Sequence, residues 1–243
     1  MMFMPYVAAI AVVGAVIAIH EWGHLLAAKW CGIPIQRFSI GFGRKLIGFT
    51  YRGTTYWLSA IPFGGYVLPG LDESEARNLP GRKAVLFALG GPVANIVSAY
   101  LGLIALARVE RSLPAIDALT FAATQLWIHT QLMARAIGLL FTGAADLTGV
   151  IGIVAIGGSQ FGFTLTGLLA FSVAINLNLA MFNLLPLPPL DGGRVAFAIL
   201  QKIYRPLVRI QAPVTVAGWV LMCALMIYTT VLDLGRIGMH VLS

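Results

Sequence analysis

AIHEWGHLLA, residues 18–27, places His20, Glu21 and His24 inside an apolar segment that is long enough to cross a membrane. A charged side chain at the centre of a spanning helix costs on the order of 2.5–3.5 kcal/mol, so such residues indicate a functional site. On a helix the two histidines lie one turn apart on one face, where both imidazoles can reach one metal ion. The spacing predicts a zinc site, with Glu21 beside it as the general base of a hydrolase.

The composition is that of an integral membrane protein. Of the 243 residues, 59% are hydrophobic and 10% are charged, with a mean hydropathy of +0.88. Soluble domains are typically about 45–50% apolar. Cys31 and Cys223 lie too far apart in the sequence to suggest a disulfide framework or a cysteine metal site. We expect an all-α membrane protein in one domain, residues 1–243, with four spans near residues 4–29, 84–107, 164–186 and 213–234.

The positive charges indicate membrane topology. The net charge is +7, but the basic residues form no patch with interleaved aromatic residues, which argues against a nucleic-acid partner. By the positive-inside rule, the connections between spans one and two and between spans three and four face the cytoplasm, and both termini lie on the opposite side. The basic residues in these connections are Lys29, Arg37, Arg44, Lys45, Arg52, Arg77, Arg82 and Lys83, and then Arg194, Lys202, Arg205 and Arg209.

The segments between the spans differ in character. Residues 35–69 are rich in aromatic residues, Ile and Gly and have no helical period, which predicts a small β-hairpin or sheet with a turn at residues 52–54. Unpaired backbone cannot face lipid, so this sheet lies at the membrane interface or in a protein-lined cavity. Residues 117–142 are expected to form an interfacial helix. The glycine-rich segment 142–162 is expected to be a loop or a re-entrant segment.

A catalytic zinc normally has three protein ligands, so one more ligand is needed besides the two histidines. Asp191 follows the third span in NLLPLPPLDGG, where three prolines unwind the helix and Gly192-Gly193 permit a close backbone approach. We therefore predict that Asp191 is the third ligand. The alternative is that it caps the following helix, since Asp is a favoured capping residue.

Two asparagines, Asn178 and Asn183, lie on the third span, and Asn176 is close to them. Their amides are suited to hydrogen-bond the backbone of a bound peptide or an oxyanion. The commoner use of Asn in a span is to join helices, and this alternative stays open.

HEWGH and NLLPLPPLDGG together resemble the site-2 protease family of intramembrane zinc metalloproteases, most closely its bacterial envelope-stress members. CGIPIQRFSIGFGRKL, AIPFGGYVLPGLDE and GGPVAN are similar to further stretches of that family, so the resemblance covers nearly the whole chain. It implies that His20, His24 and Asp191 bind Zn²⁺ and that Glu21 is the general base.

The resemblance also implies where substrate binds. Asn178 and Asn183 match family asparagines that hold substrate, and residues 61–67 match a β-loop that presents it in extended form. Adding an unwound segment to a sheet edge replaces the hydrogen bonds that the segment loses. The implied substrate-binding residues are Asn183, Asn178, Gly64, Gly65 and Asn95.

The same resemblance implies a biological setting. The expected substrates are single-pass transmembrane segments in the lipid bilayer, such as a trimmed anti-sigma factor or a remnant signal peptide in a stress response. An upstream site-1 protease would supply them already shortened. The expected location is the bacterial inner membrane, with the active site toward the cytoplasm and both termini periplasmic.

One feature departs from the family pattern. Bacterial relatives of this branch carry one or two periplasmic PDZ domains between the second and third conserved spans, whereas here only a short link follows residue 107. We expect no PDZ domain, so size selection of substrates by that route is in doubt.

Two other classes of function are compatible with polar residues in a span. A transporter or metal-handling membrane protein also places His and Asp along an ion path, but this sequence has no evident inverted repeat and transport does not require Glu21. A catalytically inactive scaffold would not need the complete set of catalytic residues.

Overall fold

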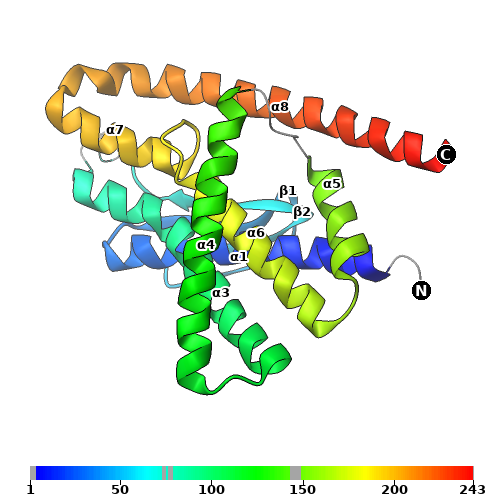
Figure 1. Ribbon diagram of the computed structural model, residues 1–243. Coiled ribbons are helices and arrows are strands. Elements are labelled where there is room, and N and C mark those ends of the chain that lie inside the picture. Colours follow the sequence, from blue (N-terminus) through cyan, green and yellow to red (C-terminus); the bar gives the residue numbers. More distant parts are fainter. Residues whose placement is uncertain (1–3, 73–74, 76–78, 143–148, 243) are drawn as a thin grey trace. The chain divides into compact units, whose positions relative to one another are not determined.

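The structure is a computed structural model that describes residues 4–72, 75, 79–142 and 149–242. Four of the described helices are long and apolar enough to cross a membrane, which confirms the predicted number of spans. Their ends differ from the predicted ends by a few residues, most in the last helix, which begins five residues earlier and continues further. The four are α1 (Met4–Trp30), α3 (Gly81–Arg111), α6 (Leu165–Asn183) and α8 (Val208–Leu242), labelled in Figure 1.

The aromatic segment forms the predicted hairpin. Strand β1 (Ile35–Tyr51) pairs antiparallel with β2 (Thr54–Pro69), and Tyr51 is opposite Thr54 at the turn. Arg52 and Gly53 between them have φ of 48° and 80°, the positive values that a two-residue type I′ turn requires. The central part of β1 lies between two segments of β2, because Ser39 pairs with both Trp57 and Tyr66.

A small apolar core fixes the hairpin to α1. Leu25 and Ala28 of α1 pack with buried residues at the start of β1, and Trp22 contacts the ring of Phe38 edge to face at 5.9 Å. The buried residues of this core are Leu25, Ala28, Ile33, Ile35 and Phe38. The hairpin is therefore held against the same turns of α1 that carry the HEWGH motif.

The middle of the chain is more helical than expected. Helix α4 (Ala115–Thr142) confirms the helix predicted near residues 117–142, and residues 112–114 join it to α3. The glycine-rich segment was expected to be a loop or re-entrant, but from Val150 it forms α5 (Val150–Ile156) and a π-helical turn, η1 (Gly157–Phe161). Residues 143–148 of that segment lie outside the described residues.

The third span ends where the prolines begin. Helix α6 stops at Asn183, the backbone is non-helical through Leu190, and α7 (Asp191–Ile203) begins with the predicted ligand. A proline lacks the amide hydrogen that a helix needs and disfavours helical conformation in the residue before it, so this break follows from the sequence. A 3-10 turn, η2 (Arg205–Leu207), joins α7 to α8.

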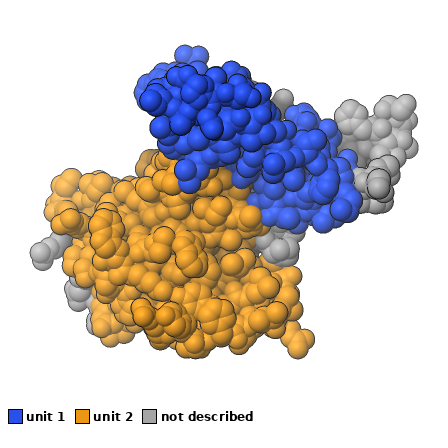
Figure 2. All heavy atoms as spheres, turned by 90° about the horizontal axis from the view of Figure 1, so that it is seen from below, with its two compact units in different colours: residues 1–12, 99–174, 216–243 blue, residues 13–98, 175–215 orange. Residues whose placement is uncertain are grey.

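The chain divides into two compact units, shown in two colours in Figure 2. One unit comprises residues 1–12, 99–174 and 216–243. The other comprises residues 13–98 and 175–215, and it holds the hairpin and all the predicted site residues.

Candidate active site

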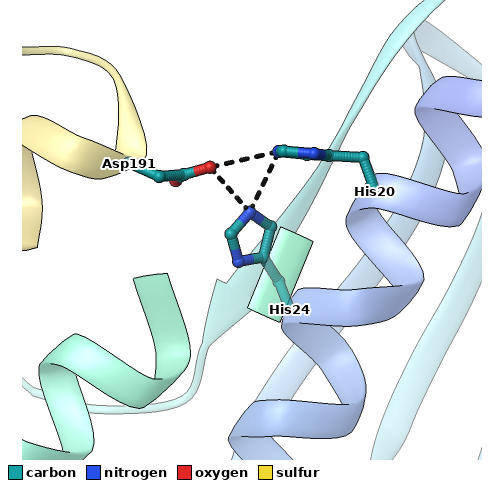
Figure 3. A group of neighbouring side chains, drawn as sticks. All are labelled: His20, His24 and Asp191. Carbon is teal, nitrogen blue, oxygen red and sulfur yellow. Dashed lines mark hydrogen bonds and ion pairs between the residues drawn. The ribbon is translucent and has the colours of Figure 1, made fainter. Parts of the chain in front are cut away.

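The structure brings the three predicted metal ligands together. His20 and His24 extend from one face of α1, and Asp191 approaches from the first turn of α7 (Figure 3). The His20 Nε2 and His24 Nε2 atoms are 3.2 Å apart, and each lies 3.1 Å from Asp191 Oδ2. All three residues are buried, with exposed fractions of 6%, 5% and 6%.

This spacing fits zinc. Ligand atoms about 2.0–2.1 Å from a tetrahedral zinc ion lie roughly 3.3–3.4 Å from one another. The three observed distances of 3.1–3.2 Å are close to that value. Two imidazole nitrogens and one carboxylate oxygen form a three-ligand set of the kind that catalytic zinc sites use.

The other ring nitrogen of each histidine is hydrogen-bonded within the protein. His24 Nδ1 is 2.8 Å from the Phe87 carbonyl oxygen, and His20 Nδ1 is 2.5 Å from Asn95 Oδ1. The Gly91 amide nitrogen is also near this atom, 3.3 Å from His24 Nδ1, but a carbonyl accepts hydrogen bonds only, so the shorter contact with Phe87 places the histidine hydrogen on Nδ1. Its Nε2 then presents a lone pair to the point where the three side chains meet.

Asp191 is a ligand candidate rather than a helix cap. The capping position of α7 belongs to Leu190, and the Asp191 carboxylate is directed to the histidines. Burial on its own would raise the pKa of Asp191, but hydrogen bonds from His20 and His24, when these are protonated on both ring nitrogens in the metal-free protein, and the charge of Arg194 outweigh burial and lower that pKa below its usual range. Arg194 Nη1 lies 3.7 Å from Asp191 Oδ1, the oxygen that does not face the histidines.

Glu21 lies beside strand β2. A Cβ atom added to Gly65 would be 2.8 Å from Glu21 Cγ and 2.8 Å from the Ser39 carbonyl oxygen, so the strand backbone passes directly over the glutamate. The neighbouring Gly64 has φ of +118°, a conformation that L side chains rarely adopt, and a Cβ there would overlap the Phe42 ring. The predicted general base therefore adjoins the strand predicted to present substrate.

The remaining predicted substrate residues have different surroundings. Asn183 ends α6, where its Nδ2 donates to the Leu179 carbonyl oxygen at 3.0 Å, and Asn178 is half-buried on the same helix. Asn95 has an exposed fraction of 0% and bonds to His20, Val16 and Asn176. These contacts place Asn95 behind a predicted metal ligand, His20, and leave its side chain no exposed surface in this structure.

Sequence reasoning missed Gly91 as part of the site. A Cβ atom on Gly91 would be 2.6 Å from both Nε2 and Cε1 of His20 and would also overlap His24 Nε2. The signal was present, because Gly90-Gly91 is a glycine pair inside a spanning helix, where glycine permits close helix packing. The Phe87 carbonyl gave no sequence signal, since any residue supplies one.

Comparison with known proteins agrees with this geometry. The sequence profile described as Peptidase family M50 matches residues 8–227, most of the chain. A Campylobacter jejuni protein named "Putative zinc metalloprotease" is 25% identical over 346 residues, with 96% of this chain and 94% of that protein covered. A Brucella suis protein of the same description is 56% identical over 71 residues, 29% of this chain and 19% of its own length. The "Membrane metalloprotease ARASP, chloroplastic" of Arabidopsis thaliana is 25% identical over 320 residues, covering 83% of this chain and 71% of that protein.

Proposed function

The chain belongs to Peptidase family M50, a family of membrane zinc metalloproteases, and from this premise we propose that it hydrolyses peptide bonds within single-pass transmembrane segments. The observation that carries the proposal is the convergence of His20, His24 and Asp191 within 3.2 Å of one another, beside Glu21. Family membership favours this function over the transporter and the inactive scaffold.

We assign the zinc ligands to His20 Nε2, His24 Nε2 and Asp191 Oδ2. Zinc, when bound, polarises the scissile carbonyl and lowers the pKa of a water molecule. Glu21 accepts the proton of the attacking water and delivers it to the amine that leaves. Arg194, paired with the second oxygen of Asp191, holds the carboxylate in the orientation that turns Oδ2 toward the histidines.

Strand β2 is the proposed site for an extended substrate. A transmembrane helix keeps its carbonyls in internal hydrogen bonds, so its cleavage requires local unwinding, and pairing with a strand replaces the lost bonds. Gly64 and Gly65 leave room for a second backbone close to Glu21. Asn178 and Asn183, on the helix that leads to Asp191, are proposed to hold the other side of the substrate.

The proposed location is a bacterial inner membrane, with the active site toward the cytoplasm and both termini in the periplasm. The concentration of basic residues in the two connections predicted to be cytoplasmic supports this orientation. The match to the Campylobacter jejuni protein extends over 346 residues, more than this chain contains, so that relative carries inserted residues. Only residues 112–114 join α3 to α4 here, and we propose that substrates reach this enzyme already shortened by an upstream site-1 protease.

A Glu21→Gln variant tests the function. The amide has nearly the shape of the carboxylate but cannot accept the proton, so the variant is expected to bind zinc with unchanged affinity and to cut at least about 100-fold more slowly. Each variant is co-expressed with candidate single-pass proteins, and cleavage is detected as a fragment released from the membrane. Zinc content is determined on the purified proteins. Cleavage by the Glu21→Gln variant at the wild-type rate would refute the role of Glu21 as general base.

A further inference from the structure

Two fully buried asparagines form a connected group behind the metal ligands. Asn95 on α3 and Asn176 on α6 each have an exposed fraction of 0%. Asn95 Oδ1 lies 2.5 Å from His20 Nδ1, and Asn95 Nδ2 donates to Asn176 Oδ1 at 2.7 Å and to the Val16 carbonyl oxygen at 3.3 Å. The group therefore links α1, α3 and α6 and ends on a predicted zinc ligand.

The Val16 contact determines which way the Asn95 amide points. A backbone carbonyl only accepts hydrogen bonds, so the Asn95 atom that faces Val16 is the NH₂ nitrogen. The amide oxygen must then face His20, and His20 must carry its hydrogen on Nδ1 to donate to it. This leaves the lone pair of His20 on Nε2, the atom that faces His24 and Asp191.

Asn176 completes the arrangement. The Asn95 NH₂ group has two hydrogens, and the Val16 carbonyl uses one of them. The shorter contact, 2.7 Å to Asn176 Oδ1, uses the other. A buried amide hydrogen without a partner costs about 1–3 kcal/mol, so the Asn176 oxygen stabilises the orientation of Asn95 that the Val16 carbonyl determines.

The two histidines differ in how they are oriented. His24 donates to the carbonyl of Phe87, a backbone group that every residue at that position would supply. His20 depends on a side chain, so its orientation depends on the identity of residues 95 and 176. Partners of this kind fix the tautomer and ring position of metal-ligating histidines.

We propose that Asn176 and Asn95 form a hydrogen-bond relay that positions His20 for zinc binding by fixing its Nδ1–H tautomer. The inference rests on the proposed zinc site and adds to it two positioning residues that do not touch substrate. It replaces the predicted role of Asn95 in substrate binding.

The test measures zinc affinity of the full chain in detergent by competition with a chromophoric chelator. Asn95→Leu, which removes the acceptor, is expected to weaken zinc binding about 10–100-fold, the usual effect of losing an outer partner of a ligand. Asn95→Asp keeps an acceptor for His20 and is expected to stay within about 3-fold of wild type. Asn176→Leu leaves the contact between Asn95 and His20 in place, so it is expected to weaken zinc binding less than Asn95→Leu does.

Thr54→Val is the matched control. Thr54 is 4% exposed, and its Oγ1 donates to the Ile35 carbonyl oxygen at 3.0 Å, so the variant loses a buried hydrogen bond of the same unit that does not lead to a ligand. It is expected to bind zinc as wild type does. Visible absorption of the Co²⁺-substituted proteins supplies a second readout, because a displaced His20 alters the ligand field.

The outcomes separate the relay from a purely structural role. If the asparagines only join the helices, Asn95→Asp, which loses both donor contacts, should bind zinc as weakly as Asn95→Leu does. Across the variants, zinc affinity should then follow the thermal stability of the metal-free protein. Equal zinc affinity of Asn95→Leu and wild type overturns the relay. If Asn95→Leu does not fold, wild-type affinity in Asn176→Leu overturns it instead. Failure of the wild type itself to bind zinc would refute the metal site, which is a different result.

Discussion

Replacing Gly91 with Ala tests the metal site at its most crowded point. The added methyl carbon would be 2.6 Å from His20 Nε2, whereas ordinary van der Waals contact begins at 3.4 Å, so the ring must move by about 0.8 Å. It would also overlap His24 Nε2. Both nitrogens are predicted zinc ligands, and the methyl group therefore competes with the ion for the same space.

The histidine rings have little freedom to move away. Each is held from behind, His20 by the 2.5 Å contact with Asn95 and His24 by the 2.8 Å contact with the Phe87 carbonyl. Metal–ligand distances tolerate changes of only about 0.2 Å, so a displacement four times as large removes at least one ligand. We expect zinc affinity to fall at least about 100-fold, equivalent to about 2.7 kcal/mol. Overpacking of this size typically costs about 1–3 kcal/mol of folding free energy, so the variant should still fold.

The assay is chelator competition on purified protein, with zinc content measured by mass spectrometry and thermal unfolding recorded without metal. Gly138→Ala in α4 is the matched control, because a Cβ there would meet nothing within 4 Å. It is expected to leave zinc affinity unchanged. A Gly91→Ala protein that folds and binds zinc within about 3-fold of wild type would show that the ion does not lie between these residues.

Two further variants address the strand and the other unit. Gly65→Ala would place a carbon 2.8 Å from Glu21 Cγ, so the rate of peptide cleavage should fall at least about 10-fold while zinc affinity is retained. A loss of zinc affinity would contradict the idea that strand β2 contacts the general base and not the zinc ligands. Asp233 is 2% exposed and accepts a hydrogen bond from the Gly152 amide at 2.8 Å, so Asp233→Leu should destabilise the protein by about 1–3 kcal/mol, measured as a lower melting temperature in detergent. Asp233→Asn keeps an acceptor for the Gly152 amide, so its melting temperature should fall by less. Equal melting temperatures for the two variants would refute the role of this hydrogen bond.

Much of the fold could be predicted from the sequence because it depends on local sequence patterns. Span number follows from runs of apolar residues, and the hairpin turn follows from Arg52-Gly53, where the backbone needs positive φ. The break before Asp191 follows from prolines that cannot continue a helix. Helix α5 was not predicted because the glycine content suggested a loop or a re-entrant segment, while tertiary contacts such as the Asp233 hydrogen bond to Gly152 support a short helix despite its composition.

The site was predictable only in part, for a related reason. The His20 and His24 pair is fixed by helical spacing, and Asp191 was reachable because few acids follow residue 150. The contacts of Asn95 could not be predicted, since one sequence cannot show which groups its amide meets. Its contacts join residues 75 and 81 positions apart in the chain, a separation that no periodicity encodes.

Helix packing and ligand orientation draw on the same contacts in this protein. Helices in a membrane gain little from the hydrophobic effect, so they associate through small residues that let their backbones approach. Gly23 and Gly90 do this for α1 and α3, because a Cβ on Gly90 would be 2.5 Å from the Gly23 carbonyl oxygen. That approach is what brings the Phe87 carbonyl within 2.8 Å of His24 and Asn95 within 2.5 Å of His20. The glycines that join the helices therefore also position the two imidazoles, and a change that separates α1 from α3 should release both predicted ligands at once.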